Sequence, residues 1–289
     1  MKHRLQQVRS RKRCAMKETT GFSVLMSVYC KEKPEYLKAA VESVVTQTLV
    51  PNEIILVEDG PLTDELYDVI HELEVRHSIL KPIQLPENVQ LGRALAEGVK
   101  NCQYELIARM DTDDIAVNNR FELQYAYMQE HPEVAVLGGY IEEFDDQDDT
   151  YHKVKTMPLV HEELIKYARY RNPINHMTVM YRKEVILDAG NYRHFPFLED
   201  YELWSRVLSK GYIFANLPHV LVHARTNAGI YERRGGKEYC KTYMKLRKLQ
   251  KNYGLVTWTE HQVAKALTFV MTRQPAMLRK LMYRKTLRK

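Results

Sequence analysis

The sequence predicts an α/β fold: a mostly parallel central sheet with helices on both faces, followed by a C-terminal helical extension. Three observations lead to this prediction. Short apolar runs alternate with segments of helical periodicity over residues 22–110. The chain has 289 residues and an ordinary hydrophobic fraction of 45%, enough for a sizeable core. From about residue 237 the pattern becomes helical and basic.

The first half contains four predicted strands, at residues 22–28, 54–57, 80–85 and 104–110. Pro82 interrupts the third strand and places it near an edge of the sheet. Helices are predicted between these strands, beginning at Pro34 and covering residues 63–77 and 91–101. Strands joined by helices in this way run parallel, and ligands bind beyond their carboxyl ends.

The second half is less regular. Strands are predicted at residues 134–141 and 177–181, an acidic loop at 145–149, and a helix at 200–209. In the last helix, Thr259 is the predicted N-cap and Gln262 the residue that completes a capping box.

Charge is distributed unevenly along the chain. The formal net charge is +6, but residues 1–17 and residues 273–289 each carry seven Lys or Arg and no acid. Residues 18–272 therefore have a net charge of about −8. The basic ends suit an anionic membrane surface or nucleic acid, or they are solvated tails. The acidic body counts against nucleic acid, and no nucleic-acid partner is expected.

The four cysteines form no CxxC pair and have no histidine cluster near them. This pattern argues against a zinc site and a disulfide framework, and suits a reducing compartment. No apolar run reaches about 18 residues, so no transmembrane helix is expected. The basic N-terminus lacks the apolar segment of a secretory signal.

An acidic cluster, Asp111-Thr112-Asp113-Asp114, directly follows the fourth predicted strand. Three carboxylates so close together repel one another unless a cation lies among them. Mg²⁺ and Mn²⁺ prefer oxygen ligands and are often shared between carboxylates and substrate phosphates. The cluster therefore predicts a diphosphate-metal site for Mn²⁺ or Mg²⁺. The alternative is that Asp113 or Asp114 caps a helix beginning after residue 116.

Several segments together resemble the family 2 glycosyltransferases. They are Ser23–Tyr29, Val41–Thr48, Ile54–Gly60, Asn88–Gly92, Ile107–Asp114, Asn172–His176 and Leu198–Trp204, collinear from about residue 22 to 225. The resemblance implies a GT-A (nucleotide-diphospho-sugar transferase) fold and an inverting, metal-dependent hexosyltransferase. Its donor would be UDP-galactose, UDP-N-acetylglucosamine or UDP-glucose, and its acceptor a hydroxyl of a glycan or lipid-linked glycan. Enzymes with this layout build bacterial surface polysaccharides, which implies a cytoplasmic enzyme, peripheral on the inner face of the cytoplasmic membrane.

The resemblance also implies roles for residues of the first half. Ser27 and Tyr29 would line the nucleotide base pocket, and Asp59 would accept a hydrogen bond from the base. Asp111 would bind the nucleotide and Asp113 the metal on the diphosphate. The chain departs from the family in having Glu58-Asp59 and Gly60-Pro61, where two aspartates and Gly-Ser are common. Without the resemblance, Tyr29 also suits a packed aromatic and Asp59 a turn residue.

Asp200 is the predicted catalytic base. Inversion requires a carboxylate opposite the leaving diphosphate, to take the proton of the attacking hydroxyl. The alternative is that Glu199 and Asp200 only stabilise the N-terminus of the helix that follows them. Six residues are further candidate substrate contacts: Arg109, Asp114, His176, Glu199, Arg233 and Arg234. Some of these residues also suit a structural role. Arg109 could brace the carboxylates, and His176 could be a buried structural residue. Arg233 and Arg234, together with Arg225, could form a basic surface loop.

Other functions fit the sequence less well. A sugar-phosphate nucleotidyltransferase requires a glycine-rich basic loop after the first strand, and an oxidoreductase requires GxGxxG there. Residues 27–32 contain no glycine. A non-catalytic nucleic-acid-binding protein would use the basic tails.

We therefore divide the chain into four predicted segments. They are a basic tail (1–20), a nucleotide-sugar-binding half (21–115), an acceptor-binding and catalytic half (116–236) and a basic helical extension (237–289).

Overall fold

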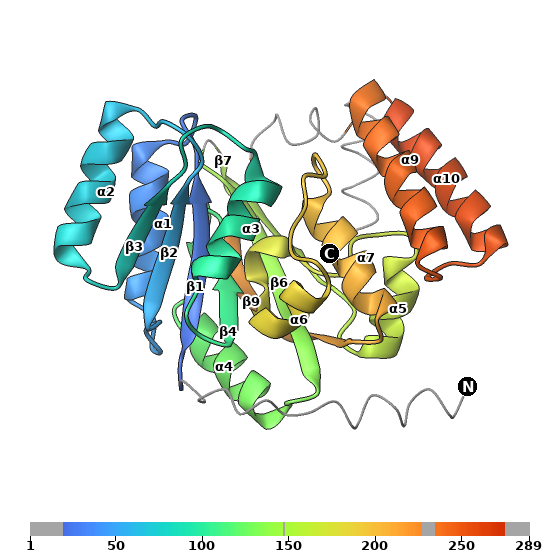
Figure 1. The fold of residues 1–289 in the computed structure, drawn as a ribbon, viewed down its shortest axis with the longest axis horizontal. Coiled ribbons are helices and arrows are strands. Elements are labelled where there is room, and N and C mark those ends of the chain that lie inside the picture. The colour runs from blue at the N-terminus through green and yellow to red at the C-terminus, as the bar shows by residue number, and fades with distance from the viewer. Residues whose placement is uncertain (1–19, 147, 227–234, 275–289) are drawn as a thin grey trace.

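The structure is a computed structural model that describes residues 20–146, 148–226 and 235–274. Within these ranges, one 9-stranded sheet has the order β3-β2-β1-β4-β8-β6-β9-β5, and β7 pairs with β6. Helices lie on both faces of this sheet, and two further helices follow at the C-terminal side (Figure 1). The predicted α/β class with a C-terminal helical extension is confirmed.

The first half follows the prediction closely. Its strands are β1 (Phe22–Val28), β2 (Glu53–Glu58), β3 (Leu80–Gln84) and β4 (Leu106–Arg109). Its helices are α1 (Pro34–Val45), α2 (Asp64–Arg76) and α3 (Leu91–Asn101). β1 pairs in parallel with β2 and β4, and β2 with β3, which is the edge strand expected from Pro82.

The second half is a mixed sheet. Its strands are β5 (Ile115–Ala116), β6 (Val134–Asp145), β7 (Asp148–Lys155), β8 (Met180–Arg182) and β9 (Ile213–Arg225). Its helices are α4 (Arg120–Glu130), α5 (His161–Ala168), α6 (Lys183–Asp188), α7 (Glu199–Ser209), α9 (Lys237–Asn252) and α10 (Trp258–Arg273). β8 is antiparallel to both β4 and β6, whereas β6 and β9 are parallel. The parallel arrangement thus applies to the first four strands and to the β6–β9 pair.

Three local predictions in this half were wrong. The acidic segment 145–149 is not a loop throughout, because β6 includes Asp145, β7 begins at Asp148, and the two strands pair as an antiparallel hairpin. The predicted strand 177–181 begins as a 3₁₀ turn at His176–Thr178, and β8 follows it. The N-cap of α10 is Thr257, whose side chain forms a capping box with Glu260. The Thr-x-x-Glu pattern lies two residues before the Thr-x-x-Gln pattern used for the prediction.

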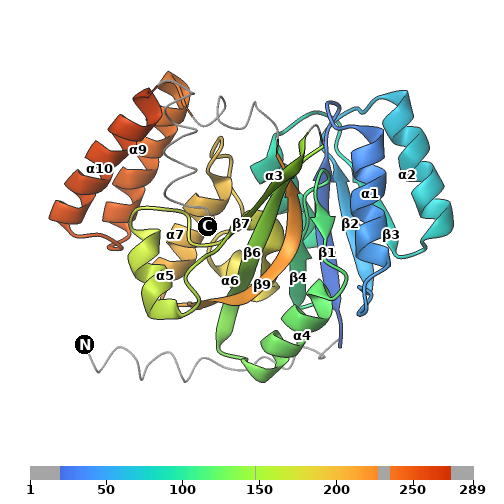
Figure 2. The same ribbon diagram turned by 180° about the vertical axis from the view of Figure 1, so that it is seen from behind.

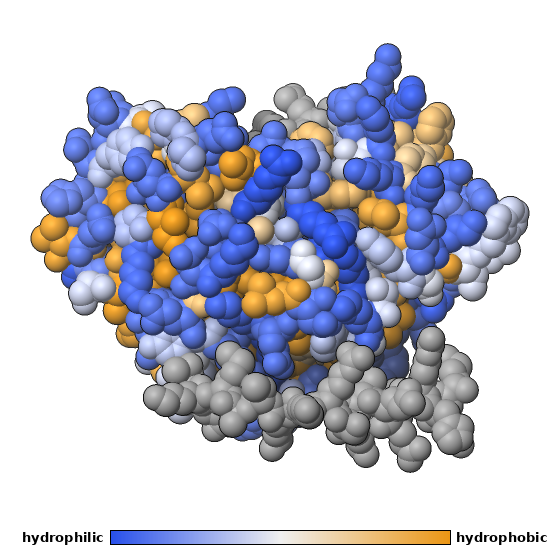
Figure 3. Space-filling model, in the orientation of Figure 1, coloured by the Kyte–Doolittle hydropathy of each residue, from blue (hydrophilic) through white to orange (hydrophobic). Residues whose placement is uncertain are grey.

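Successive side chains along the strands point to opposite faces of the sheet and form two apolar layers. Val24, Met26 and Leu56 face one layer, in which α1, α2 and α4 pack. Leu25, Ile55 and Ile107 face the other, in which α3, α6 and α7 pack. The two opposite views show these helices on the two sides of the sheet (Figures 1 and 2). In the space-filling view, exposed hydrophobic side chains form patches among hydrophilic ones (Figure 3).

Helices α9 and α10 form a hairpin at the end of the molecule opposite α2 (Figures 1 and 2). Buried Arg247 on α9 fixes the hairpin to the body, because its guanidinium donates to the carbonyls of Arg169 (3.1 Å) and Tyr170 (2.6 Å). Tyr239 and Leu246 of α9 add a small apolar cluster with neighbouring residues of the body. Among the described helices, none is both long and apolar enough to cross a bilayer.

Close packing of α3 on the sheet generates a stability prediction. A Cβ on Gly98 would lie 2.2 Å from Leu25 Cδ1 and 2.9 Å from Val57 Cγ2, both in buried side chains. We expect Gly98→Ala to lower the free energy of unfolding by about 1–3 kcal/mol, since overpacking outweighs the better helix propensity of alanine. Urea denaturation measures this change. Lys100→Ala, at an exposed position of α3, is the control and should change stability by less than about 0.5 kcal/mol.

Candidate active site

Three predicted segments meet at one edge of the sheet. Because β1, β2 and β4 are parallel, their carboxyl ends lie together, and Ser27, Asp59 and the acidic cluster all belong to these ends. The Asp59 amide donates to Val28 O (2.8 Å), and the Thr112 hydroxyl donates to Ser27 O (3.4 Å). Tyr29 follows β1 and is 43% exposed at this edge. The convergence predicted from the strand pattern is therefore observed.

Asp59 is buried and held by the segment that precedes α3. The amide of Val89 donates to Asp59 Oδ1 (2.7 Å), and the Asn88 side chain donates to the Asp59 carbonyl (3.1 Å). Burial raises the pKa of Asp59, against the effect of the Val89 and Gln90 amides. Gly60 permits this contact, because its φ is +85° and a Cβ would lie 2.5 Å from the Asn88 nitrogen.

The carboxylates of Asp111, Asp113 and Asp114 gather between β4 and β5, with one oxygen from each within 4.8 Å of the others. The helix-capping alternative is wrong, because β5 follows the cluster and α4 begins later, with Asn119 as its N-cap. Burial, together with the charges of Asp111 and Glu32, raises the pKa of Asp113 to about 7. Burial and the other two carboxylates raise the pKa of Asp114 well above its usual range. A divalent cation would offset this repulsion, so the donor set fits Mg²⁺ or Mn²⁺.

Arg109 ends β4 and is only 2% exposed. Its guanidinium forms an ion pair with Asp111. Burial opposes its charge, but the nearby Asp111 carboxylate raises the pKa of Arg109 above its usual value. Its field also acts on Asp113 and on Asp200. Within the described part of the chain, Arg109 Nε and Nη1 are buried without a hydrogen-bond partner. Arg109 therefore braces the cluster through Asp111, while two of its donors have no partner among the described residues.

Arg225 closes the other side of the cluster. Its backbone amide donates to Asp114 Oδ1 (2.8 Å), and its Nε donates to the Asp113 carbonyl (2.9 Å). The guanidinium also lies over the ring of Tyr36, 4.0 Å from its centroid, and pairs with Asp146. The expectation that Arg225 belongs to a basic surface loop was wrong, because it is the last residue of β9. Arg233 and Arg234 lie outside the described residues.

Asp200 and Glu199 occupy the first turn of α7. The Asn172 amide donates to Asp200 Oδ2, and the Tyr201 backbone amide donates to Asp200 Oδ1 (2.7 Å). Burial raises the pKa of Asp200, while these two hydrogen bonds favour its ionised form. Burial and the Asp200 charge raise the pKa of Glu199 to about 7. Helix stabilisation and a proton-transfer role are compatible at this position.

His176 lies beside the same region but has a partner within the protein. Its Nε2 is 2.9 Å from the Tyr192 hydroxyl, and its ring packs edge-on against Trp204 at 6.2 Å. Burial lowers its pKa well below the usual value, with Arg109 adding to this effect. These contacts favour the structural interpretation, and a contact between His176 and substrate stays a prediction.

Sequence reasoning did not single out several residues that order the site. Arg120 is fully buried on α4 and donates to the Arg109 carbonyl (2.7 Å). Glu32 accepts a hydrogen bond from Thr112 (2.7 Å), and Asp146 accepts one from Tyr36 (2.7 Å). A charged residue among the apolar positions of α4 was the one available signal for Arg120. The contacts of Glu32 and Asp146 depend on tertiary packing, which leaves no pattern in the local sequence.

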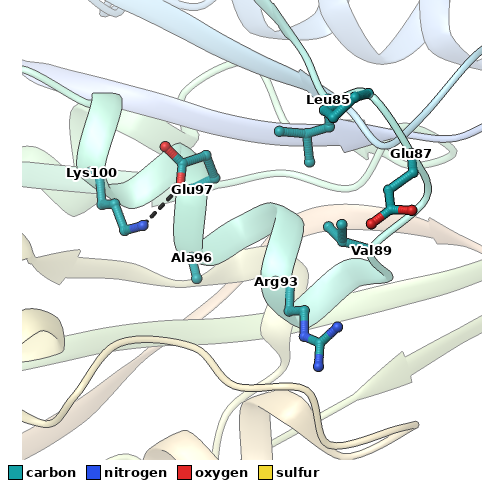
Figure 4. Close-up of a pocket in the computed structure, with 8 residues that line it drawn as sticks. Leu85, Glu87, Val89, Arg93, Ala96, Glu97 and Lys100 are labelled. Atoms are coloured by element: carbon teal, nitrogen blue, oxygen red, sulfur yellow. Dashed lines mark hydrogen bonds and ion pairs between the residues drawn. The ribbon is translucent and has the colours of Figure 1, made fainter.

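A separate cavity of about 350 Å³ lies beside α3 (Figure 4). Its lining combines apolar and charged side chains: Leu85, Pro86, Glu87, Val89, Arg93, Ala96, Glu97 and Lys100. None of the predicted site residues is among them. The cavity touches the site through Val89, whose amide holds Asp59. The acidic cluster, rather than this cavity, is therefore the centre of the candidate site.

Known proteins resemble this chain over most of its length. The family model described as glycosyl transferase family 2 matches residues 23–188. An uncharacterized glycosyltransferase of Haemophilus influenzae is 41% identical, over 93% of this chain and 99% of that protein. The amylovoran biosynthesis glycosyltransferase AmsE of Erwinia amylovora is 39% identical, over 91% and 98%. The UDP-Gal:alpha-D-GlcNAc-diphosphoundecaprenol beta-1,3-galactosyltransferase of Escherichia coli is 32% identical, over 94% and 98%.

Solved structures share the fold. Residues 1–349 of S. aureus TarS, in complex with UDP-GlcNAc, align with a TM-score of 0.64 and 17% identity, over 86% of this chain and 72% of that one. A mannosyltransferase of Pyrobaculum calidifontis, PcManGT, in complex with GDP-Man and Mn2+, aligns with a TM-score of 0.58 and 13% identity, over 97% and 85%.

The raised pKa values of the cluster generate a prediction about metal binding. Because a carboxylate must lose its proton to bind a cation, and the pKa of Asp113 is about 7, Mn²⁺ affinity should rise through pH 7. We expect a gain of about tenfold between pH 6 and pH 8, measured by calorimetric titration with Mn²⁺. Asp113→Asn should bind weakly at both pH values. A wild-type affinity that is flat over this range would contradict the prediction.

The raised pKa of Asp113 also predicts how the stability of the metal-free protein depends on pH. Folding raises the pKa of this carboxyl group. Its ionisation therefore destabilises the folded state once the pH exceeds the pKa of the unfolded state. The loss of folding free energy is complete above the pKa of the folded state. Metal-free Asp113→Asn should therefore be more stable than wild type at pH 8, by at least about 1 kcal/mol, with a smaller difference at pH 5. Thermal unfolding in the presence of EDTA measures both values.

Proposed function

Because this chain belongs to glycosyl transferase family 2, we propose that it transfers a sugar from a UDP-sugar to a hydroxyl of a lipid-linked glycan, with inversion at the anomeric carbon. One observation carries the proposal. Two sets of carboxylates, Asp111 to Asp114 and Glu199-Asp200, lie around the buried guanidinium of Arg109, which pairs with Asp111 and whose charge also acts on Glu199 and Asp200. Such separate sets suit a reaction that needs a metal ligand and a base in different places.

The donor is proposed to lie across the carboxyl ends of β1, β2 and β4. The uracil ring would stack on the exposed ring of Tyr29 beside Ser27, and Asp59 would accept its N–H. Asp111 would bind the ribose. The two unpartnered nitrogens of Arg109 are proposed to donate to the donor, which would satisfy buried groups that the described residues leave unpaired.

Asp113 is proposed to hold Mn²⁺ or Mg²⁺, with Asp114 and Asp111 close by. When bound, the ion offsets the charge that develops on the departing diphosphate. Arg225 keeps the two aspartates in place through its contacts with Asp114 and with the Asp113 carbonyl. The role of Asp114 is then to complete the negative charge of the cluster while its own carboxylate stays fixed to the end of β9.

Asp200 is proposed to act as the base. The acceptor oxygen forms a bond to the anomeric carbon, the bond from that carbon to the diphosphate oxygen breaks, and the acceptor proton passes to the Asp200 carboxylate. Asn172 and the Tyr201 amide orient this carboxylate and favour its ionised form. Glu199, whose pKa is raised to about 7 by burial and the Asp200 charge, is proposed to bind a hydroxyl of the donor or acceptor.

The proposed substrates follow from the chemistry in the relatives' names. The E. coli relative takes UDP-Gal and a GlcNAc-diphosphoundecaprenol acceptor, and aligns over 94% of this chain. We therefore place UDP-galactose first among the donors, ahead of UDP-N-acetylglucosamine and UDP-glucose. A lipid-linked acceptor would place the reaction at the inner face of the cytoplasmic membrane, with the protein attached peripherally.

The donor claim is tested by thermal shift and by hydrolysis of the three UDP-sugars with Mn²⁺. One of them should raise the melting temperature of the wild type, and Asp113→Asn should remove most of that shift. Asp188→Asn, on the exposed end of α6, is the matched control and should keep the shift. If no UDP-sugar stabilises the wild type, or if Asp113→Asn behaves like the control, the proposed donor site is wrong.

The base is tested by Asp200→Asn, which keeps the shape of the side chain but removes its basicity. Transfer should fall by about 10²–10⁴-fold, whereas the UDP-sugar and Mn²⁺ thermal shift should stay within about twofold of wild type in apparent affinity. Transfer is measured with a synthetic GlcNAc-diphospholipid acceptor. Loss of donor binding together with transfer would instead assign Asp200 to the structure of the site.

A further inference from the structure

Helix α10 has an exposed apolar stripe on the side away from the body. Val263, Leu267 and Val270 are spaced as i, i+4 and i+7, so they lie on one face, and they are 51%, 51% and 48% exposed. We call these three residues the α10 stripe. The opposite side of the helix, at His261, Ala264, Thr268 and Thr272, is buried. The stripe is therefore an apolar face that is separate from the side of the helix that packs within the protein.

We propose that the α9–α10 hairpin is a docking surface for an anionic lipid bilayer, with the α10 stripe entering the interfacial layer. The inference rests on the proposed function, because it names the surface where a lipid-linked acceptor would be met. An interfacial helix of this kind combines an apolar face with cationic flanks and lies in the plane of the membrane.

Charge complementarity selects the bilayer as the partner. Residues 237–273 carry eight Lys or Arg against two Glu, a net charge of +6. Residues 18–236 carry 22 Lys or Arg against 35 Asp or Glu, a net charge of −13. Lys265 and Arg273, both exposed, lie on α10 itself. An anionic membrane would therefore attract the hairpin and repel the remaining body, which orients the protein with the hairpin toward the lipid.

The same charges oppose two other occupants of the stripe. A second copy of the chain would bring another hairpin of net charge +6 against the first. The sequence that follows α10, residues 275–289, contains six Lys or Arg and no acid, so its charge also opposes packing on the hairpin. Both occupants would bring like charges together, whereas anionic headgroups remove this repulsion.

The hairpin contacts the segment that precedes the predicted catalytic base. Tyr239 of α9 packs on Phe197, with ring centroids 5.6 Å apart, and joins an apolar cluster with Phe195 and Leu198. Glu199 and Asp200 follow this segment in sequence. Phe197 is itself 53% exposed. The hairpin that is proposed to meet the bilayer therefore packs against the segment that leads into Asp200.

Sedimentation with vesicles tests the proposal on the full-length protein. Wild type should bind vesicles of 70% phosphatidylcholine and 30% phosphatidylglycerol at low salt, and bind less at 0.5 M NaCl. The triple variant Val263→Asp, Leu267→Asp, Val270→Asp should lower the partition coefficient about tenfold or more, because three apolar side chains no longer enter the interface. Pure phosphatidylcholine vesicles should bind the wild type far more weakly.

Val75→Asp is the matched control. Val75 is 75% exposed on α2, at the opposite end of the molecule, so the same kind of change there should leave vesicle binding unaltered. Circular dichroism and urea denaturation of each variant establish that the proteins are folded. Equal binding by the triple variant and wild type would overturn the proposal. A wild-type dimer in sedimentation equilibrium that the triple variant abolishes would also overturn it, since the stripe would then bind a second copy.

Failure of the docking proposal and failure of the proposed function give different results. Donor binding is measured on the same proteins in solution by the UDP-sugar and Mn²⁺ thermal shift. A wild type that binds donor but no vesicles contradicts the docking surface alone. A wild type that binds vesicles through the stripe but shows no shift with any UDP-sugar contradicts the proposed function alone.

Discussion

The ion pair between Arg109 and Asp111 is the interaction on which the site depends. Three carboxylates and a nearby pair of acids share a partly buried edge of the sheet, where their mutual repulsion is strong because the local dielectric is low. Arg109 places one permanent positive charge beside them. A buried cation is itself costly unless it is paired, so the guanidinium and the carboxylates depend on each other. Arg120, fully buried behind Arg109, holds the backbone of this residue through its carbonyl.

Sequence patterns predicted the first half of the fold well, because short apolar runs and helix periodicity are local signals. Residues 22–28 form a short apolar run in the sequence, and the structure buries Val24 and Met26 in one apolar layer and Leu25 in the other. The second half was predicted less well. The antiparallel insertion of β8 between β4 and β6 joins segments about 45–75 residues apart, and a three-residue strand has too little pattern to indicate its partners.

The candidate site was also predicted only in part from the sequence. The grouping of Ser27, Asp59 and the acidic cluster followed from parallel strand ends, which topology alone brings together. The anchoring by Arg225 was missed because it requires the pairing of β5 with β9, which are separated by about a hundred residues. The proposed roles of Asp200 and Glu199 rest on a motif, and the structure adds the Asn172 hydrogen bond and the effect of the Arg109 charge on both carboxyl groups.

The acidic cluster occupies a short turn whose two ends are both strands of the same sheet: β4 is paired to β1 and β8, and β5 to β9. Its oxygens are therefore confined before any cation arrives, and the entropy of ordering them is lost during folding rather than during binding. A cation would then need little reorganisation of the chain. The carboxylates would then keep their places from one catalytic cycle to the next, so exchange of substrates would not require the metal site to be rebuilt.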